Sequence, residues 1–142
     1  MNGHMPAARA ERLREIPLFA TLPDAALQAL AQISTEIDVP AGQVLIRPYD
    51  PGLGMFVVEE GRVVVELHRG REVELGPGEF FGELALLIPE GVRAARVRAE
   101  VDTRCLAIGR EDFAKLLDEE PRIAVAMLPV IARRLADEIR SQ

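Results

Sequence analysis

The spacing of apolar residues along the chain predicts helices at both ends and strands between them. Residues 7–15 predict a short helix, and Leu27, Leu30 and Ile33 recur at the helical spacing that predicts a second one. From Glu36 onward, apolar residues fall instead into short runs separated by glycine and proline, which is typical of β-strands. Helical spacing returns near the C-terminus. The pattern predicts N-terminal helices within 7–33, a β region over 36–108 and C-terminal helices within 110–140, all in one domain of residues 1–142.

The β region has the pattern of an antiparallel double sheet. Glu60–Gly61 and His68–Gly70 interrupt runs of β-forming residues and are typical of hairpin turns. No stretch has the spacing of a strand, a crossover helix and a second strand, so a parallel sheet is not expected. We therefore predict a mainly β fold, an antiparallel double-stranded β-helix (jelly roll), with flanking helices. The expected strands are Glu36–Val39, Val44–Ile46, Met55–Glu59, Arg62–His68, Glu72–Leu75, Arg96–Val101 and Arg104–Ile108.

Two helices are expected after Gly109. The first is Arg110–Glu119, with Phe113 facing inward, and the second starts at Pro121 and runs to about Arg140. The second helix carries apolar residues at helical spacing, and they cover one of its faces. These residues are Met127, Leu128, Ile131, Leu135 and Ile139.

Length and charge narrow the class of protein. The chain of 142 residues has the size of one domain, and no apolar run approaches the ~18–20 residues of a membrane span. Residues 1–10 lack the apolar core of a secretory signal. The net charge of −6 disfavours a nucleic-acid binder, because duplex binding relies on clustered lysine and arginine. Arginines concentrate at 93–98 and 133–140, and an acidic protein with a local basic pocket suits a small anion.

Cysteine and histidine are too scarce for several kinds of site. Cys105 is the single cysteine, so no intrachain disulfide can form, which indicates a reducing, cytoplasmic location. It alternates with apolar residues, which favours a small core residue over a reactive thiol. His4 and His68 are too few for the histidine cluster that metal-dependent jelly-roll enzymes need, and no Ser or Cys has the context of a nucleophile. We therefore expect no catalytic residue, no metal site and no enzymatic activity.

Residues 81–97 carry the chemistry around which the chain is organised. Gly82 allows a tight turn, and a one-turn helix over Glu83–Leu86 would leave its first backbone N–H groups without intrahelical partners. Such a helix end suits a phosphate, and Arg93 adds a planar, permanent positive charge for the same anion. Glu83 is a good acceptor for a sugar hydroxyl. An anion site beside a hydroxyl acceptor suggests a nucleotide.

The sequence from Gly82 to Leu87, followed by Arg93-Ala94-Ala95, resembles the phosphate-binding cassette of cyclic-nucleotide-binding domains. This module is shared by the bacterial catabolite activator protein and the regulatory subunits of protein kinase A. The cassette is similar in loop length to that of the bacterial activator. Three further blocks are similar to the family, so the resemblance covers roughly residues 17–140. They are 40–45 with 50–52, 56–63, and 75–80.

The resemblance implies a role for each residue of the cassette. Glu83 would accept a hydrogen bond from the ribose 2′-hydroxyl, and Arg93 would pair with the cyclic phosphate. Backbone N–H groups near Leu84, Ala85 and Ala94 would complete the phosphate cradle. The small residues Ala85, Ala94 and Ala95 let the backbone approach the ligand. The implied ligand is cAMP or cGMP, and no cofactor is expected. The expected ligand-binding residues are Phe81, Gly82, Glu83, Leu84, Ala85, Arg93, Ala94, Ala95 and Arg134.

Two departures from the family pattern concern the phosphate and the base. Many members have Ser or Thr one or three residues after the arginine, where this chain has Ala94 and Arg96. We expect Arg96 to face solvent, and the lack of the threonine that accompanies cGMP preference makes cAMP the preferred ligand. The second departure is in 137–139, which contain no hydroxyl where the long helix of the bacterial activator offers hydroxyls to adenine. Arg134 remains available to reach Glu83 or the nucleotide.

The resemblance implies a stand-alone regulatory or sensor domain in which ligand binding rearranges the C-terminal helices. Expected partners are a second copy through the C-terminal helix, as in the family, and an unknown protein effector. Alternatively, the apolar stripe of that helix packs on the chain's own β core.

Neither direct DNA binding nor membrane association is expected. The chain stops at Gln142, directly after the long helix, where the activator family continues into a helix-turn-helix domain. Two alternative functions stay open. One is a degenerate domain that binds a protein instead of a nucleotide, and the other is the truncated sensor domain of a transcription regulator.

Overall fold

The computed structural model describes residues 6–16, 19–47, 54–67, 70–82 and 95–140. The chain divides into two units, one made of Met1–Gln32 with Lys115–Gln142 and the other of Ile33–Ala114. We call the first the helical unit and the second the β unit, and each is described by itself.

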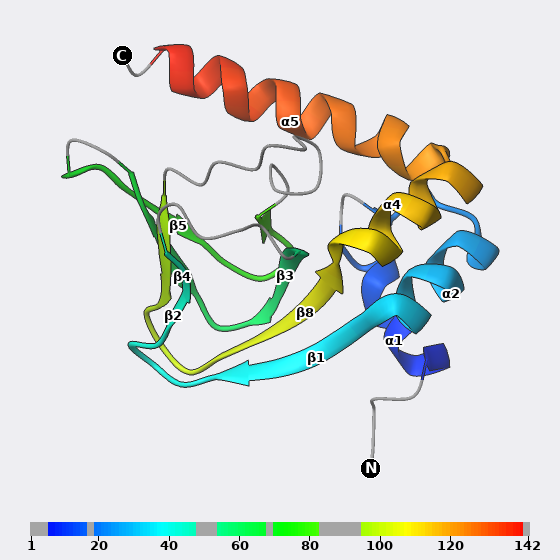
Figure 1. Ribbon diagram of the computed structural model, residues 1–142, viewed down its shortest axis with the longest axis horizontal. Helices are drawn as coiled ribbons and strands as arrows, with labels where there is room; N and C mark the ends of the chain where they lie inside the picture. Colours follow the sequence, from blue (N-terminus) through cyan, green and yellow to red (C-terminus); the bar gives the residue numbers. More distant parts are fainter. Residues whose placement is uncertain (1–5, 17–18, 48–53, 68–69, 83–94, 141–142) are drawn as a thin grey trace. The chain divides into compact units, whose positions relative to one another are not determined.

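Among the described residues, the β unit contains two four-stranded sheets (Figure 1). The order in the first sheet is β1 (Ser34–Val39), β8 (Thr103–Gly109), β3 (Gly54–Glu60) and β6 (Phe80–Phe81). The order in the second sheet is β2 (Val44–Ile46), β7 (Arg96–Ala99), β4 (Val63–Glu66) and β5 (Glu72–Leu75). Every pairing between neighbours is antiparallel. The predicted mainly β, antiparallel fold with flanking helices is confirmed.

Inward-facing residues of both sheets meet in one apolar cluster. Val58, Phe81 and Cys105 come from the first sheet, Val63 and Val97 come from the second, and all five are buried. Full burial of an aliphatic or aromatic side chain stabilises the fold by roughly 1.5–3 kcal/mol, so this cluster holds the two sheets together. Burial also raises the pKa of the Cys105 thiol to about 12. The prediction that Cys105 is a small core residue is confirmed.

The turn at Glu60–Gly61 is not a hairpin. β3 pairs with β8 and β6, whereas β4 pairs with β5 and β7, so this turn carries the chain from one sheet to the other. The prediction was wrong because alternation shows which residues face the core but not which strand lies alongside. The second predicted hairpin is confirmed by its strands. β4 and β5 pair in antiparallel register, and the Leu67 N–H donates to the Arg71 carbonyl at 2.8 Å.

Strand β6 was not predicted, because two residues are too few to show an alternating pattern. The other strands lie within about two residues of their predicted bounds, which is the usual uncertainty of element ends.

Gly61 lies where two turns meet. Its φ of +97° is in the left-handed region that favours glycine. A Cβ at this position would lie 2.6 Å from Thr103 Oγ1 and 2.7 Å from the Asp102 carbonyl oxygen. Thr103 Oγ1 accepts a hydrogen bond from the Arg62 N–H at 3.2 Å and donates to the Val101 carbonyl at 2.7 Å. The turn before β4 is thereby tied to the turn before β8.

The helical unit begins with α1 (Pro6–Arg14) and α2 (Asp24–Ile33). Polar contacts join the two helices: Arg9 Nη1 donates to the Ala31 carbonyl at 3.1 Å, and Arg14 pairs with Asp24. Leu27 and its apolar neighbours on α2 are buried, as their spacing predicts. The predicted N-terminal helices are therefore confirmed.

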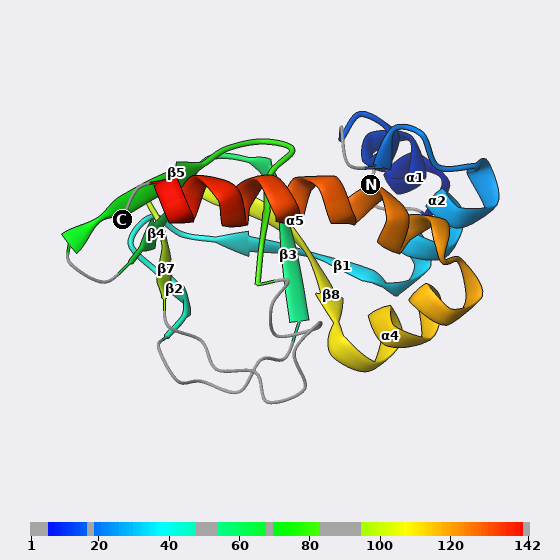
Figure 2. The same ribbon diagram turned by 90° about the horizontal axis from the view of Figure 1, so that it is seen from above.

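After the last strand come α4 (Arg110–Glu119) and α5 (Arg122–Arg140), as predicted, and α5 is a single long helix (Figure 2). The apolar face predicted on α5 is not uniform. Met127 is buried, whereas Leu128, Leu135 and Ile139 are each 62% exposed and Val125 is 64% exposed. We name these four exposed residues the exposed stripe. No helix in the described ranges combines the length and hydropathy needed to cross a membrane.

Gly61→Ala is expected to destabilise the chain by about 2–4 kcal/mol, because the new methyl group meets Thr103 and Asp102 in a left-handed backbone. Gly42→Ala is the matched control. Gly42 has a φ of +88°, but a Cβ there meets nothing within 4 Å. Only conformational strain of about 1 kcal/mol is then expected. Thermal unfolding followed by circular dichroism measures both variants, and equal losses of stability would contradict the argument from contact.

Candidate functional site

The predicted ligand-binding residues are divided between the two units. Phe81, Gly82 and Ala95 lie in the β unit, and Arg134 lies half-buried on α5 in the helical unit. The structure therefore brings three of the predicted residues into one unit. The remaining predicted residues lie outside the described residues, and so does the one-turn helix expected over Glu83–Leu86. These remaining residues are Glu83, Leu84, Ala85, Arg93 and Ala94.

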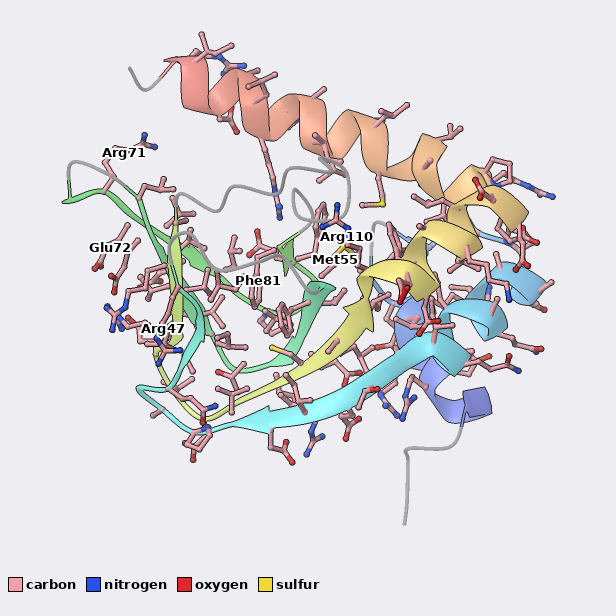
Figure 3. All side chains as sticks on the ribbon, in the orientation of Figure 1. Arg47, Met55, Arg71, Glu72, Phe81 and Arg110 are labelled. Atoms are coloured by element: carbon pink, nitrogen blue, oxygen red, sulfur yellow. The ribbon has the colours of Figure 1, made fainter. Side chains whose placement is uncertain are left out.

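Aromatic packing holds the point at which the chain enters residues 83–94. Phe81 on β6 and Phe56 on β3 are paired across the sheet, and their rings stack with centroids 5.0 Å apart and planes 15° apart. Such a pair adds about 0.5–1.5 kcal/mol to the effect of burial alone. Figure 3 shows Phe81 among the side chains between the strands, whereas Glu72 lies on the solvent side of its sheet. The ring of Phe81 therefore belongs to the core.

Gly82 follows Phe81 directly and has a φ of +85°. This backbone conformation favours glycine because a side chain would crowd the neighbouring carbonyl oxygen. The tight turn predicted here would continue into residues outside the described ranges, so it stays a prediction. A left-handed glycine thus directly follows the buried Phe81.

The chain returns from residues 83–94 into the same apolar cluster, but through the other sheet. Ala95 is half-buried and directly precedes β7, and Val97 is buried in the cluster that contains Phe81. Val97 is paired with Val65 of β4. One core cluster thus holds both ends of this segment.

The outer face of the second sheet carries ion pairs next to this return point. We name its four members, Glu66, Glu72, Arg96 and Arg98, the Glu66 cluster. Arg96 Nη1 donates to Glu66 Oε1 at 3.1 Å and to Oε2 at 3.3 Å, and Arg98 Nε donates to Oε2 at 2.7 Å. Arg98 Nη2 also reaches Glu72 Oε2 at 3.5 Å. Arg96 is exposed and engaged with Glu66, so the expectation that it faces solvent is confirmed.

The Glu66 cluster shifts the pKa values of its members. Hydrogen bonds from Arg98 and then from Arg96 lower the pKa of Glu66, and the hydrogen bond to Glu66 raises the pKa of Arg98. The Glu66 carboxylate therefore stays ionised to a lower pH than an isolated glutamate. Sequence reasoning missed this cluster, because its members come from three separate strands. The sequence did contain one signal for it. Arg96 and Arg98 alternate with the apolar Val97, so both arginines face away from the core, as Glu66 does on the neighbouring strand.

In the part of the chain that the structure describes, no group of three or more His, Cys, Asp and Glu residues could hold a metal ion. The buried Cys105 thiol has a raised pKa and is therefore a poor nucleophile. The β unit buries Phe81 and Val97, on either side of residues 83–94, in one apolar cluster.

Comparison with known proteins gives consistent matches. The family model of the cyclic nucleotide-binding domain matches residues 36–120. A cyclic nucleotide-gated potassium channel of Mesorhizobium japonicum is 41% identical over 109 residues, which cover 77% of this chain and 30% of the channel. The crystal structure of the catabolite activator protein of Thermus thermophilus is 32% identical with a TM-score of 0.77, covering 88% of this chain and 61% of that one.

A third similar protein has a structure described with the words "A cyclic-GMP-dependent signalling pathway regulates bacterial phytopathogenesis". It is 32% identical with a TM-score of 0.71, and the match covers 82% of this chain and 95% of that one. The chain thus spans less than two thirds of the channel and of the activator protein, but nearly all of this third structure.

The lowered pKa of Glu66 predicts an acid-dependent part of the stability. Because the folded state holds this carboxylate ionised, its contribution is complete at neutral pH and is lost as the pH falls below about 4. Glu66→Gln should lower the unfolding temperature by about 2 °C at pH 7, and the difference from wild type should shrink below pH 4. Thermal unfolding at several pH values measures this difference. A difference that stays constant with pH would contradict the ionic origin.

Proposed function

Because the chain belongs to the cyclic nucleotide-binding domain family, we propose that it is a regulatory module whose ligand is a cyclic nucleotide. One observation supports this proposal best. Phe81 and Val97, which lie on either side of residues 83–94, are buried in one core cluster, and this part of the chain lies within the range that the family model matches. A segment held at both ends can present Glu83 and Arg93 to one ligand with little loss of entropy on binding.

In this proposal the ligand is bound through its phosphate and its ribose. Arg93 pairs with the cyclic phosphate through its planar guanidinium group, backbone N–H groups near Leu84, Ala85 and Ala94 complete the cradle, and Glu83 accepts a hydrogen bond from the ribose 2′-hydroxyl. The positive φ of Gly82 supports the assignment, since tight turns use this conformation and Gly82 directly precedes Glu83. The half-buried Ala95 supports it as well, because a methyl side chain leaves room for the backbone to approach a ligand.

We propose cAMP as the preferred ligand over cGMP. Position 96 holds an arginine and not the threonine that accompanies cGMP preference, and Arg96 is engaged with Glu66 on the outer face of its sheet. The similar protein whose description names cyclic GMP makes cGMP the competing ligand to test.

We further propose that ligand binding repositions the C-terminal helices and that α5 forms a homodimer. The exposed stripe supports the dimer, because 125, 128, 135 and 139 fit the alternating three- and four-residue spacing of a helix seam and would be covered by a second copy. Arg134, on the same helix, is the residue that we assign to contact with Glu83 or the nucleotide. A ligand that binds one helix arrangement more tightly would shift the population toward it.

The proposed role is regulatory and not enzymatic, and it acts through a protein effector. The buried Cys105, single in the chain, supports a reducing, cytoplasmic location, and the net charge of −6 supports a role without direct contact to DNA. The exposed stripe also favours a second candidate function, a protein-interaction module whose nucleotide pocket is unused.

Calorimetric titration of the chain with cAMP is expected to show binding in the micromolar range or tighter, with weaker binding of cGMP. Arg93→Ala should weaken cAMP binding by about 10- to 150-fold, because it removes a charge-assisted hydrogen-bonding partner. Arg122→Ala, which removes an exposed arginine at the start of α5, is the matched control and should leave the affinity unchanged. Absence of heat and of any thermal shift with both nucleotides would favour the protein-interaction module.

Leu135→Glu is expected to convert a dimer into a monomer, since a carboxylate would lie in the apolar seam. Sedimentation equilibrium measures the molecular mass, and the dimerisation constant should weaken at least about 100-fold. Arg133→Glu, an exposed residue on the other side of α5, is the control and should remain dimeric. A wild-type chain that sediments as a monomer would contradict the proposed dimer.

A further inference from the structure

Glu66 lies where the second sheet receives the chain from residues 83–94. It is the last residue of β4, and its paired residues are Arg96, the first residue of β7, and Glu72, the first residue of β5. Arg96 lies only three positions after Arg93 in the sequence, a reach of at most about 10 Å between their Cα atoms. The position at which β7 starts therefore limits where Arg93 can lie.

The carboxylate of Glu66 forms ion pairs with two arginines, Arg96 and Arg98. Arg96 and Arg98 lie two residues apart on the same face of β7, so they repel each other unless an anion lies between them. Glu66 accepts hydrogen bonds from both, at 2.7–3.3 Å. Among the described residues, Arg98 has a second partner in Glu72, whereas Arg96 pairs with Glu66 alone.

From this arrangement we infer that Glu66 is a positioning residue for ligand binding. Its two ion pairs fix the start of β7 against β4 and so set the position from which Arg93 meets the phosphate. The inference rests on the proposed function, since it assumes that Arg93 contacts the ligand.

The opposite end of β7 offers a matched control. Glu100, directly after β7, pairs with Arg62, directly before β4, and the Glu100 hydrogen bond raises the pKa of Arg62. This contact is also an Arg–Glu ion pair on the surface between these two strands. Glu100→Gln therefore removes an interaction of the same type, at the end of β7 that does not join residues 83–94.

The test is calorimetric titration of the full chain with cAMP for wild type, Glu66→Gln and Glu100→Gln, together with their unfolding temperatures. Glu66→Gln is expected to raise the Kd about three- to tenfold, and Glu100→Gln to change it less than about twofold. The ratio of Kd between Glu66→Gln and wild type should approach one in about 1 M salt, where exposed ion pairs are screened. A merely structural role would lower the unfolding temperature of both variants and leave this ratio at one.

A second readout does not depend on the ligand. Amide hydrogen exchange over residues 95–98 should be faster in Glu66→Gln than in wild type and unchanged in Glu100→Gln. If wild type binds cAMP but Glu66→Gln has the same Kd, or the same exchange rate over residues 95–98, the inference is overturned and the proposed function stands. A wild-type chain that binds neither cAMP nor cGMP would overturn both.

Discussion

The β unit depends on the packing of Phe81 and Val97 into one apolar cluster. The two residues belong to different sheets and are separated in sequence by residues 83–94. Because both are buried in the same core, the segment between them begins and ends at fixed points. The position of any binding group on that segment is then limited by core packing, which is the least adjustable part of a protein.

Apolar burial and surface ion pairs contribute very different free energies to the stability of this unit. A buried aliphatic or aromatic side chain contributes roughly 1.5–3 kcal/mol, whereas an exposed ion pair contributes about 0–1 kcal/mol. The core therefore determines that the two sheets meet, and the charges around Glu66 and around Arg62 can only adjust how neighbouring strands lie at their ends. Such an adjustment at the start of β7 is the basis of the role that we infer for Glu66, because Arg93 lies only three positions before Arg96.

Much of the fold was predictable, because the periodicity of apolar residues shows which side chains are buried. The pairing of strands was not predictable, because it joins residues that are far apart in the sequence. Leu27 and Leu30 revealed α2 through their helical spacing, and the partial alternation of apolar and polar residues over 62–67 revealed β4. The partner of β4 could not be read from that alternation, so the turn at Glu60–Gly61 was assigned to the wrong pairing. The same limit applies to the candidate site. The left-handed conformation of Gly82 and the outward position of Arg96 follow from local sequence, whereas the contact of Arg96 with Glu66 joins residues 30 positions apart.

The burial of Cys105 gives the chain an internal chemical reporter of its own opening. The sulfur lies in the cluster that joins the two sheets, and its raised pKa keeps it in the unreactive thiol form while that cluster is closed. Alkylation in solution then requires separation of the sheets, so its rate follows the population of opened molecules whenever closing is faster than the chemistry. Anything that binds the closed form protects this sulfur, whatever the ligand proves to be.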